Sequence, residues 1–136
     1  MQKQQQKENP ENLQILLSLL WTLYYADRAE EALDYIEQAE QMAPENPYVL
    51  TTIGELLCGE NGFGRFEEAI RYWDRALQVD EDFGDARYGK AYAYEQLGNT
   101  EEARLEYQKI CAWLRRRGAV AGEIRRVEDK IRELAR

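Results

Sequence analysis

The side chains of this chain that could take part in chemistry are mainly carboxylates. Its 136 residues include 26 aspartates and glutamates, 18 lysines and arginines, and no histidine. The most regular carboxylates are Glu-Glu pairs at positions 30–31, 67–68 and 101–102, each followed by alanine. Acidic groups in the first turn of a helix interact favourably with the helix dipole, so these pairs have a structural explanation. With no histidine base and no nucleophile beside an activating partner, the sequence predicts no enzymatic activity.

Cofactor and metal sites have equally little support in the sequence. Cys58 and Cys111 stand far apart, whereas zinc and redox-metal sites use clustered cysteines and histidines. The glycines at 59, 62 and 64 match no phosphate-binding fingerprint and are expected to lengthen a turn. We therefore expect no cofactor and no bound metal.

The Glu-Glu-Ala triplets also mark the elements that position these side chains. Their alanines, Ala32, Ala69 and Ala103, stand 37 and 34 residues apart. Spacings of four and seven residues after each alanine place further core residues on the same helical face, namely Ile36 and Ala39, Trp73 and Ala76, and Tyr107 and Ile110. Turn formers precede each triplet, and an apolar helical stretch precedes each turn. Each unit is thus predicted to be a helix, a turn and a second helix.

This pattern resembles the tetratricopeptide repeat family, whose unit has about 34 residues, small residues at helix crossings and a proline at its end. The matching residues are Ala32, Ala39 and Pro44 in the first unit, Gly54 and Ala69 in the second, and Ala91, Tyr94, Gly98, Ala103 and Tyr107 in the third. Three extra residues lengthen the turn of the second unit around Asn61. Leu20 departs from the pattern, because a small residue is usual at its position.

The predicted fold class is all-α, a right-handed α-solenoid of three such hairpins plus a C-terminal capping helix. A flexible tail is expected over residues 1–9. The repeats are expected over 10–117, as units 13–46, 47–83 and 84–117, and the capping helix over 118–136.

The last helix has an apolar seam with alternating spacings of four and three, formed by Val120, Ile124, Val127, Ile131 and Leu134. Such a seam either covers the third hairpin or pairs with a second copy as a coiled coil. It spans little more than two heptads, which is short for an independent coiled coil and favours capping.

The resemblance implies a non-enzymatic protein–protein interaction module that acts as a scaffold, adaptor or chaperone, and its length is loosely similar to bacterial secretion chaperones. In repeats of this kind the first helices line a concave groove that binds a peptide. The register places nine side chains there: Leu17, Trp21, Tyr24, Tyr48, Thr51, Glu55, Tyr88, Tyr92 and Glu95. Such a groove is aromatic with acidic edges and suits an apolar or basic peptide. The alternative is that these rings belong to the core or are covered by the chain's own tail.

Residues 13–26 raise a second hypothesis, because eleven of these fourteen residues are apolar or aromatic. The polar exceptions, Gln14, Ser18 and Thr22, form one narrow stripe, so this first helix requires cover on most sides. Either the neighbouring helices provide it, or the chain is a structural assembly subunit that forms homo-oligomers through this helix. The stretch is shorter than the roughly 20 residues of a membrane span and lacks a cleavage site, which favours a cytoplasmic chain.

Charge is distributed unevenly along the chain. Residues 1–103 carry 8 basic and 21 acidic side chains, a net charge of −13, whereas residues 104–136 carry 10 and 5, a net charge of +5. The acidic repeats would repel a polyanion, so nucleic acid is not an expected partner.

Overall fold

The computed structural model describes residues 10–59 and 64–136, so the predicted tail over residues 1–9 and the lengthened turn around Asn61 lie outside the described residues. Over the described ranges the chain forms seven helices and no strand. They are α2 (Pro10–Tyr25), α3 (Ala29–Met42), α4 (Pro47–Cys58), α5 (Phe66–Val79), α6 (Gly84–Gln96), α7 (Thr100–Arg116) and α8 (Ala121–Leu134). The predicted all-α fold class is confirmed.

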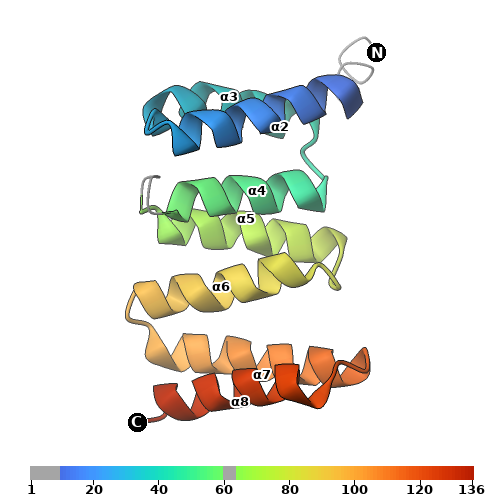
Figure 1. Ribbon diagram of the computed structural model, residues 1–136, viewed down its shortest axis with the longest axis vertical. Helices are drawn as coiled ribbons and strands as arrows, with labels where there is room; N and C mark the ends of the chain where they lie inside the picture. The colour runs from blue at the N-terminus through green and yellow to red at the C-terminus, as the bar shows by residue number, and fades with distance from the viewer. Residues whose placement is uncertain (1–9, 60–63) are drawn as a thin grey trace.

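The helices stack along the long axis of the molecule, with α2 and α3 at one end and α7 and α8 at the other (Figure 1). Each helix packs against the next one along the chain. The stack is therefore a solenoid of helical hairpins in which each unit contacts only its neighbours, as the period of the alanines predicted.

Local sequence signals start and end these helices. The side-chain oxygen of Asn46 accepts hydrogen bonds from the backbone N–H groups of Tyr48 and Val49, at 2.9 and 3.2 Å, and Pro47 fills the first helical position, where no N–H is needed. Gly98 and Gly118 follow α6 and α7 with φ of 77° and 74°, a left-handed conformation that glycine adopts without strain. The chain reverses direction at both glycines.

The apolar stripes of the second helices form the core, as predicted. Every residue of these stripes is at most 8% exposed: Ala32, Ile36 and Ala39 in α3, Ala69, Trp73 and Ala76 in α5, and Ala103, Tyr107 and Ile110 in α7. The small residues lie where helices cross, and the bulky residues fill the space beside the crossings.

Trp73 is the largest fully buried side chain of the described residues, with 1% of its surface exposed. Its indole lies against two glycines of neighbouring first helices, because a Cβ atom at Gly54 or Gly89 would be 2.7 or 2.6 Å from the ring. The indole Nε1–H donates a hydrogen bond to the carbonyl oxygen of Thr51 at 3.2 Å. One side chain of α5 thus fixes the approach of both α4 and α6.

The C-terminal helix caps the solenoid. In α8, Val127 is 6% exposed, and Ile124, Ile131 and Leu134 pack with it against a cluster from α6 and α7. The apolar seam is therefore occupied within the chain instead of facing a second copy. Val120 is a correction to the predicted seam, because it precedes the first turn of α8 and is 72% exposed.

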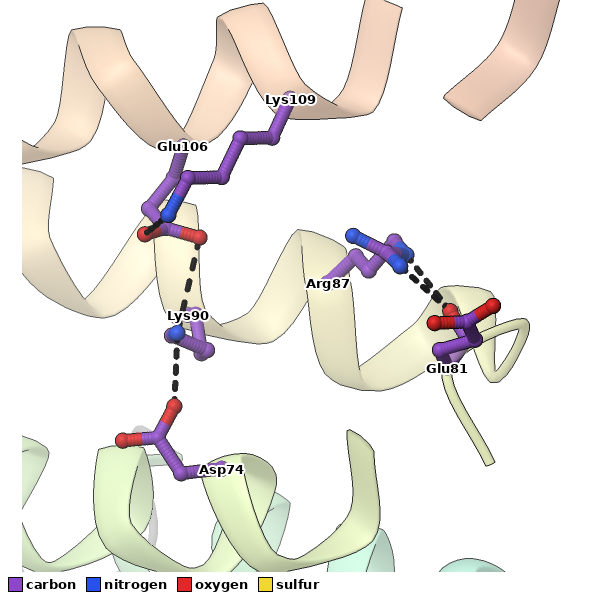
Figure 2. A network of polar contacts seen from close by, with 6 residues as sticks. All are labelled: Asp74, Glu81, Arg87, Lys90, Glu106 and Lys109. Atoms are coloured by element: carbon purple, nitrogen blue, oxygen red, sulfur yellow. Dashed lines mark hydrogen bonds and ion pairs between the residues drawn. The ribbon is translucent and has the colours of Figure 1, made fainter. Parts of the chain in front are cut away.

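Lys90 of α6 connects three helices through ion pairs (Figure 2). Its Nζ lies 2.6 Å from Asp74 Oδ1 of α5 and 3.6 Å from Glu106 Oε1 of α7, and only 13% of its side chain is exposed. Burial disfavours the charged ammonium, but the hydrogen bond to Asp74 and the charge of Glu106 outweigh it, so the pKa of Lys90 is raised. The second and third hairpins are thus joined by a charged contact as well as by the apolar core.

The contact between Trp73 and the glycines predicts that Gly89→Ala destabilises the fold. The added methyl group would lie 2.6 Å from the buried indole, and overpacking of this kind costs about 1–3 kcal/mol. The loss of stability would be measured as a lower midpoint of urea unfolding, with circular dichroism monitoring the helix content.

Gly122→Ala is the matched control, because nothing lies within 4 Å of a Cβ atom at this helical position of α8. This substitution should stabilise the protein by up to about 1 kcal/mol through helix propensity alone. Equal midpoints for the two variants would show that Trp73 does not set the helix spacing.

Candidate functional site

The first helices of the hairpins share one surface. The backbone of α4 approaches those of α2 and α6 closely, whereas no such approach joins α3 with α5 or α5 with α7. The stack is therefore more closely spaced on the side of the first helices, which makes this side the concave one. We call the exposed face of α2, α4 and α6 the inner surface.

Three of the nine side chains predicted for the groove are core residues instead. Leu17, Tyr24 and Thr51 are 3%, 8% and 2% exposed, so a ligand cannot contact them in this structure. Tyr24 fills the space in front of Gly59, where a side chain would meet its phenol group. The spacing of these residues does not show how far each side chain is covered by the adjacent hairpin.

Glu95, a fourth predicted groove residue, holds two neighbouring helices in place. Its Oε1 accepts a hydrogen bond from the hydroxyl group of Tyr107 in α7 at 2.6 Å, and its Oε2 lies 3.3 Å from Nζ of Lys130 in α8. Burial and the hydrogen bond to this carboxylate raise the pKa of Tyr107 far above its ordinary value. Glu95 thus anchors the capping helix to the third hairpin.

The remaining predicted residues are accessible. Tyr48 and Tyr92 are 50% and 45% exposed, Glu55 is exposed, and Trp21 and Tyr88 are half-buried. Their rings extend the inner surface over all three hairpins.

Tyr25 was missed by sequence reasoning although it is 72% exposed. Its ring stacks on Trp21, with the two centroids 5.8 Å apart and the planes 23° from parallel. Its position four residues after Trp21 is the signal that could have identified it, because this spacing keeps both rings on one helical face.

Carboxylates from neighbouring helices interact with side chains of the inner surface. Glu55 reaches solvent, but the surrounding helices partly remove its carboxylate from water, which raises its pKa, and the charge of Asp85 raises it further. Burial also raises the pKa of Tyr88, and the neighbouring Glu123 of α8 adds to that shift. Electrostatic interactions therefore extend from α4 across α6 to α8.

An open surface pocket of about 370 Å³, which we call the cavity, lies where α6, α7 and α8 meet. Its lining includes Asp82, Asp85, Tyr88, Trp113, Arg117 and Glu123. The indole Nε1–H of Trp113 donates a hydrogen bond to Asp82 Oδ1 at 3.2 Å. The guanidinium groups of Arg87 and Arg117 lie 5.6 and 4.6 Å from the centroid of the Trp113 ring. Arg87 also donates two hydrogen bonds to the backbone carbonyl of Glu81 (Figure 2).

A search of the described residues finds no group of three or more side chains suited to hold a metal ion. In the same part of the chain, every helix is too short or too polar to cross a membrane.

Comparison with known proteins gives consistent matches. Residues 62–121 match the family model of the tetratricopeptide repeat. The peroxisomal targeting signal receptor of Saccharomyces cerevisiae is 34% identical over 91 residues, which cover 67% of this chain and 14% of the receptor. Protein FlbA of Caulobacter vibrioides is 28% identical over 94 residues, which cover 69% of this chain and 15% of FlbA.

Among solved structures, a point mutant of MamA is similar to this chain with a TM-score of 0.63 and 26% identity, covering 82% of this chain and 80% of MamA. The match to MamA thus extends over most of both chains. By contrast, this chain spans only 14–15% of the length of the curated relatives it matches.

The raised pKa of Glu55 predicts that Glu55→Gln stabilises the fold at pH 7. Between its ordinary value of 4.5 and the raised value, the folded state binds more protons than the unfolded state, so stability falls as pH rises through this window. At neutral pH the charged carboxylate therefore opposes folding. The gain in the thermal midpoint should disappear below pH 4.5, where the carboxyl group is protonated in both states.

Glu37→Gln is the control, because Glu37 is an exposed carboxylate in the middle of α3. It should leave the midpoint nearly unchanged at both pH values. A midpoint of Glu55→Gln at or below that of the unmodified protein at pH 7 would contradict the assignment of electrostatic strain to this position.

Proposed function

Because this chain belongs to the tetratricopeptide repeat family, we propose that it binds a peptide or protein segment on its inner surface and acts as a non-enzymatic scaffold, adaptor or chaperone. The observation that carries the proposal is the exposure of aromatic side chains there, with Tyr25, Tyr48 and Tyr92 each at least 45% accessible. The segment would lie across the first helices.

The chemistry of these side chains suits such a role. A tyrosine offers a large contact area at a small loss of rotameric entropy, and its hydroxyl group can bond to a peptide backbone. The fold does not need these rings in its core, because leucines, alanines and Trp73 already fill the space between the helices.

The yeast relative gives independent support for recognition of a protein segment. It is by name a receptor for a targeting signal, and the region shared with this chain is 34% identical. The proposal extends to this chain only the kind of recognition, since the shared region is 14% of that receptor.

The double substitution Tyr48→Ala and Tyr92→Ala should weaken binding to the inner surface. Truncation of an aromatic anchor at an interface costs about 2 kcal/mol or more, which corresponds to a loss of about thirtyfold in affinity per anchor. The probe is a peptide selected from a random displayed library on the unmodified protein, and its dissociation constant is measured by fluorescence anisotropy.

Leu105→Ala is the control for this experiment, because Leu105 is 50% exposed on α7, away from the first helices. It should leave the affinity unchanged, and circular dichroism should show native helicity in both variants. If the double variant binds the selected peptide as tightly as the control, the inner surface is not the binding site.

A second candidate function is self-assembly through α2, and it is favoured by Ile15. This side chain is 68% exposed on a terminal helix, and terminal units of solenoids normally present a polar outer face.

If α2 joins two copies, Ile15→Glu should convert oligomers into monomers in sedimentation velocity over a range of concentrations. Val79→Glu, at an equally apolar site that is 51% exposed on α5, is the control. A monomeric unmodified protein over the whole range would exclude this function.

A further inference from the structure

We propose that α8 forms part of the binding surface, and that the cavity between α6, α7 and α8 accepts an arginine side chain of the bound segment. This inference rests on the proposed function, because it names the chemistry of the partner at the same inner surface.

Side chains of α8 contact side chains of α6. Lys130 of α8 pairs with Glu95 of α6 at 3.3 Å, and Glu123 of α8 interacts with the hydroxyl group of Tyr88 in α6. These contacts lie near opposite ends of the two helices, so α8 runs along α6 and is linked to it through side chains. The capping helix thus contributes side chains beside α6.

The lining of the cavity is mainly acidic. Three carboxylates line it, from Asp82, Asp85 and Glu123, and Arg117 is the one basic residue among the described residues of its lining. The Arg117 guanidinium lies 4.6 Å from the centroid of the Trp113 ring. Within the described part of the chain, none of the three carboxylates forms an ion pair with lysine or arginine. A cationic side chain from a partner would complement this charge.

The aromatic walls favour arginine over lysine. Tyr88 and Trp113 line the cavity, and a planar guanidinium stacks on aromatic faces and bonds carboxylates with two parallel N–H groups. The guanidinium groups of Arg87 and Arg117 already lie over Trp113, so Tyr88 is the ring that we assign to a partner's guanidinium group. A cavity of about 370 Å³ has room for one more such side chain.

Negative charge outside the cavity also favours a partner segment that contains arginine. Asp85 interacts electrostatically with Glu55 of α4, so the negative field continues along the inner surface toward the exposed tyrosines. The described helices α2 to α6 lie within residues 1–103, which carry a net charge of −13. The occupant we assign is therefore a segment with alternating apolar and arginine residues, in which the tyrosines contact the apolar positions.

The test compares two labelled peptides on the full chain by fluorescence anisotropy at low salt. One peptide alternates leucine and arginine, and the other carries citrulline, which has the shape of arginine without its charge, at every arginine position. The unmodified protein should bind the arginine peptide about tenfold or more tighter than the citrulline peptide. The double variant Asp85→Asn and Glu123→Gln should bind the two peptides within about twofold of each other.

A second double variant, Asp34→Asn and Glu37→Gln, is the matched control, because it removes two exposed carboxylates outside the cavity. It should keep the preference of the unmodified protein. If the Asp85→Asn and Glu123→Gln variant also keeps that preference, the cavity is not the arginine site.

The remaining outcomes separate this inference from the proposed function. Equal binding of both peptides to the unmodified protein, lost in the Tyr48→Ala and Tyr92→Ala variant, would overturn the arginine site and leave the peptide-binding surface intact. Binding of neither peptide, or a dimer in sedimentation that neither peptide dissociates, would overturn both proposals.

Discussion

The spacing of the solenoid depends on the contact between the Trp73 indole and the bare backbones of α4 and α6. Gly54 and Gly89 leave room for the ring, and a single methyl group at either position would lie closer than atoms of folded proteins approach one another. The same arrangement recurs where Trp113 of α7 lies against Gly84 of α6. Because each tryptophan also donates a hydrogen bond, to Thr51 and to Asp82 respectively, its ring is fixed in orientation as well as in position.

Among the described residues, some polar side chains stabilise the fold through their partners and others oppose it. Lys90 and Glu95 each bridge two neighbouring helices and therefore belong to the scaffold. Glu55 instead has a raised pKa, because burial disfavours its charged form and the charge of Asp85 adds to that effect, so its carboxylate opposes folding at neutral pH. Strain of this kind persists at positions that serve binding, because a partner of opposite charge relieves it.

The two ends of the solenoid differ in what they present to solvent. At the C-terminal end, α8 directs its apolar seam toward α7 and exposes mostly charged residues, as a terminal helix of a repeat array should. At the N-terminal end, α2 packs its leucines inward but leaves Ile15 exposed. The capping helix also contributes Glu123 to the cavity beside α6, so one helix both closes the core and shapes the surface where we place the partner.

The sequence by itself determined the helical hairpins and their core, because the period of the alanines and the spacings of four and seven residues are local consequences of helix geometry. Trp73, Tyr107 and Ile110 lie in the core as those spacings predicted. The resemblance to the tetratricopeptide repeat implied that the first helices line a groove. Only the tertiary structure decided which of their side chains remain accessible: it buried Leu17, Tyr24 and Thr51, paired Glu95 with α7 and α8, and exposed Tyr25. Helical spacing fixes the direction of a side chain around the axis of its helix, whereas its burial and pairing depend on other helices. For Glu95 the partners are Tyr107 and Lys130, which are 12 and 35 positions away in the chain.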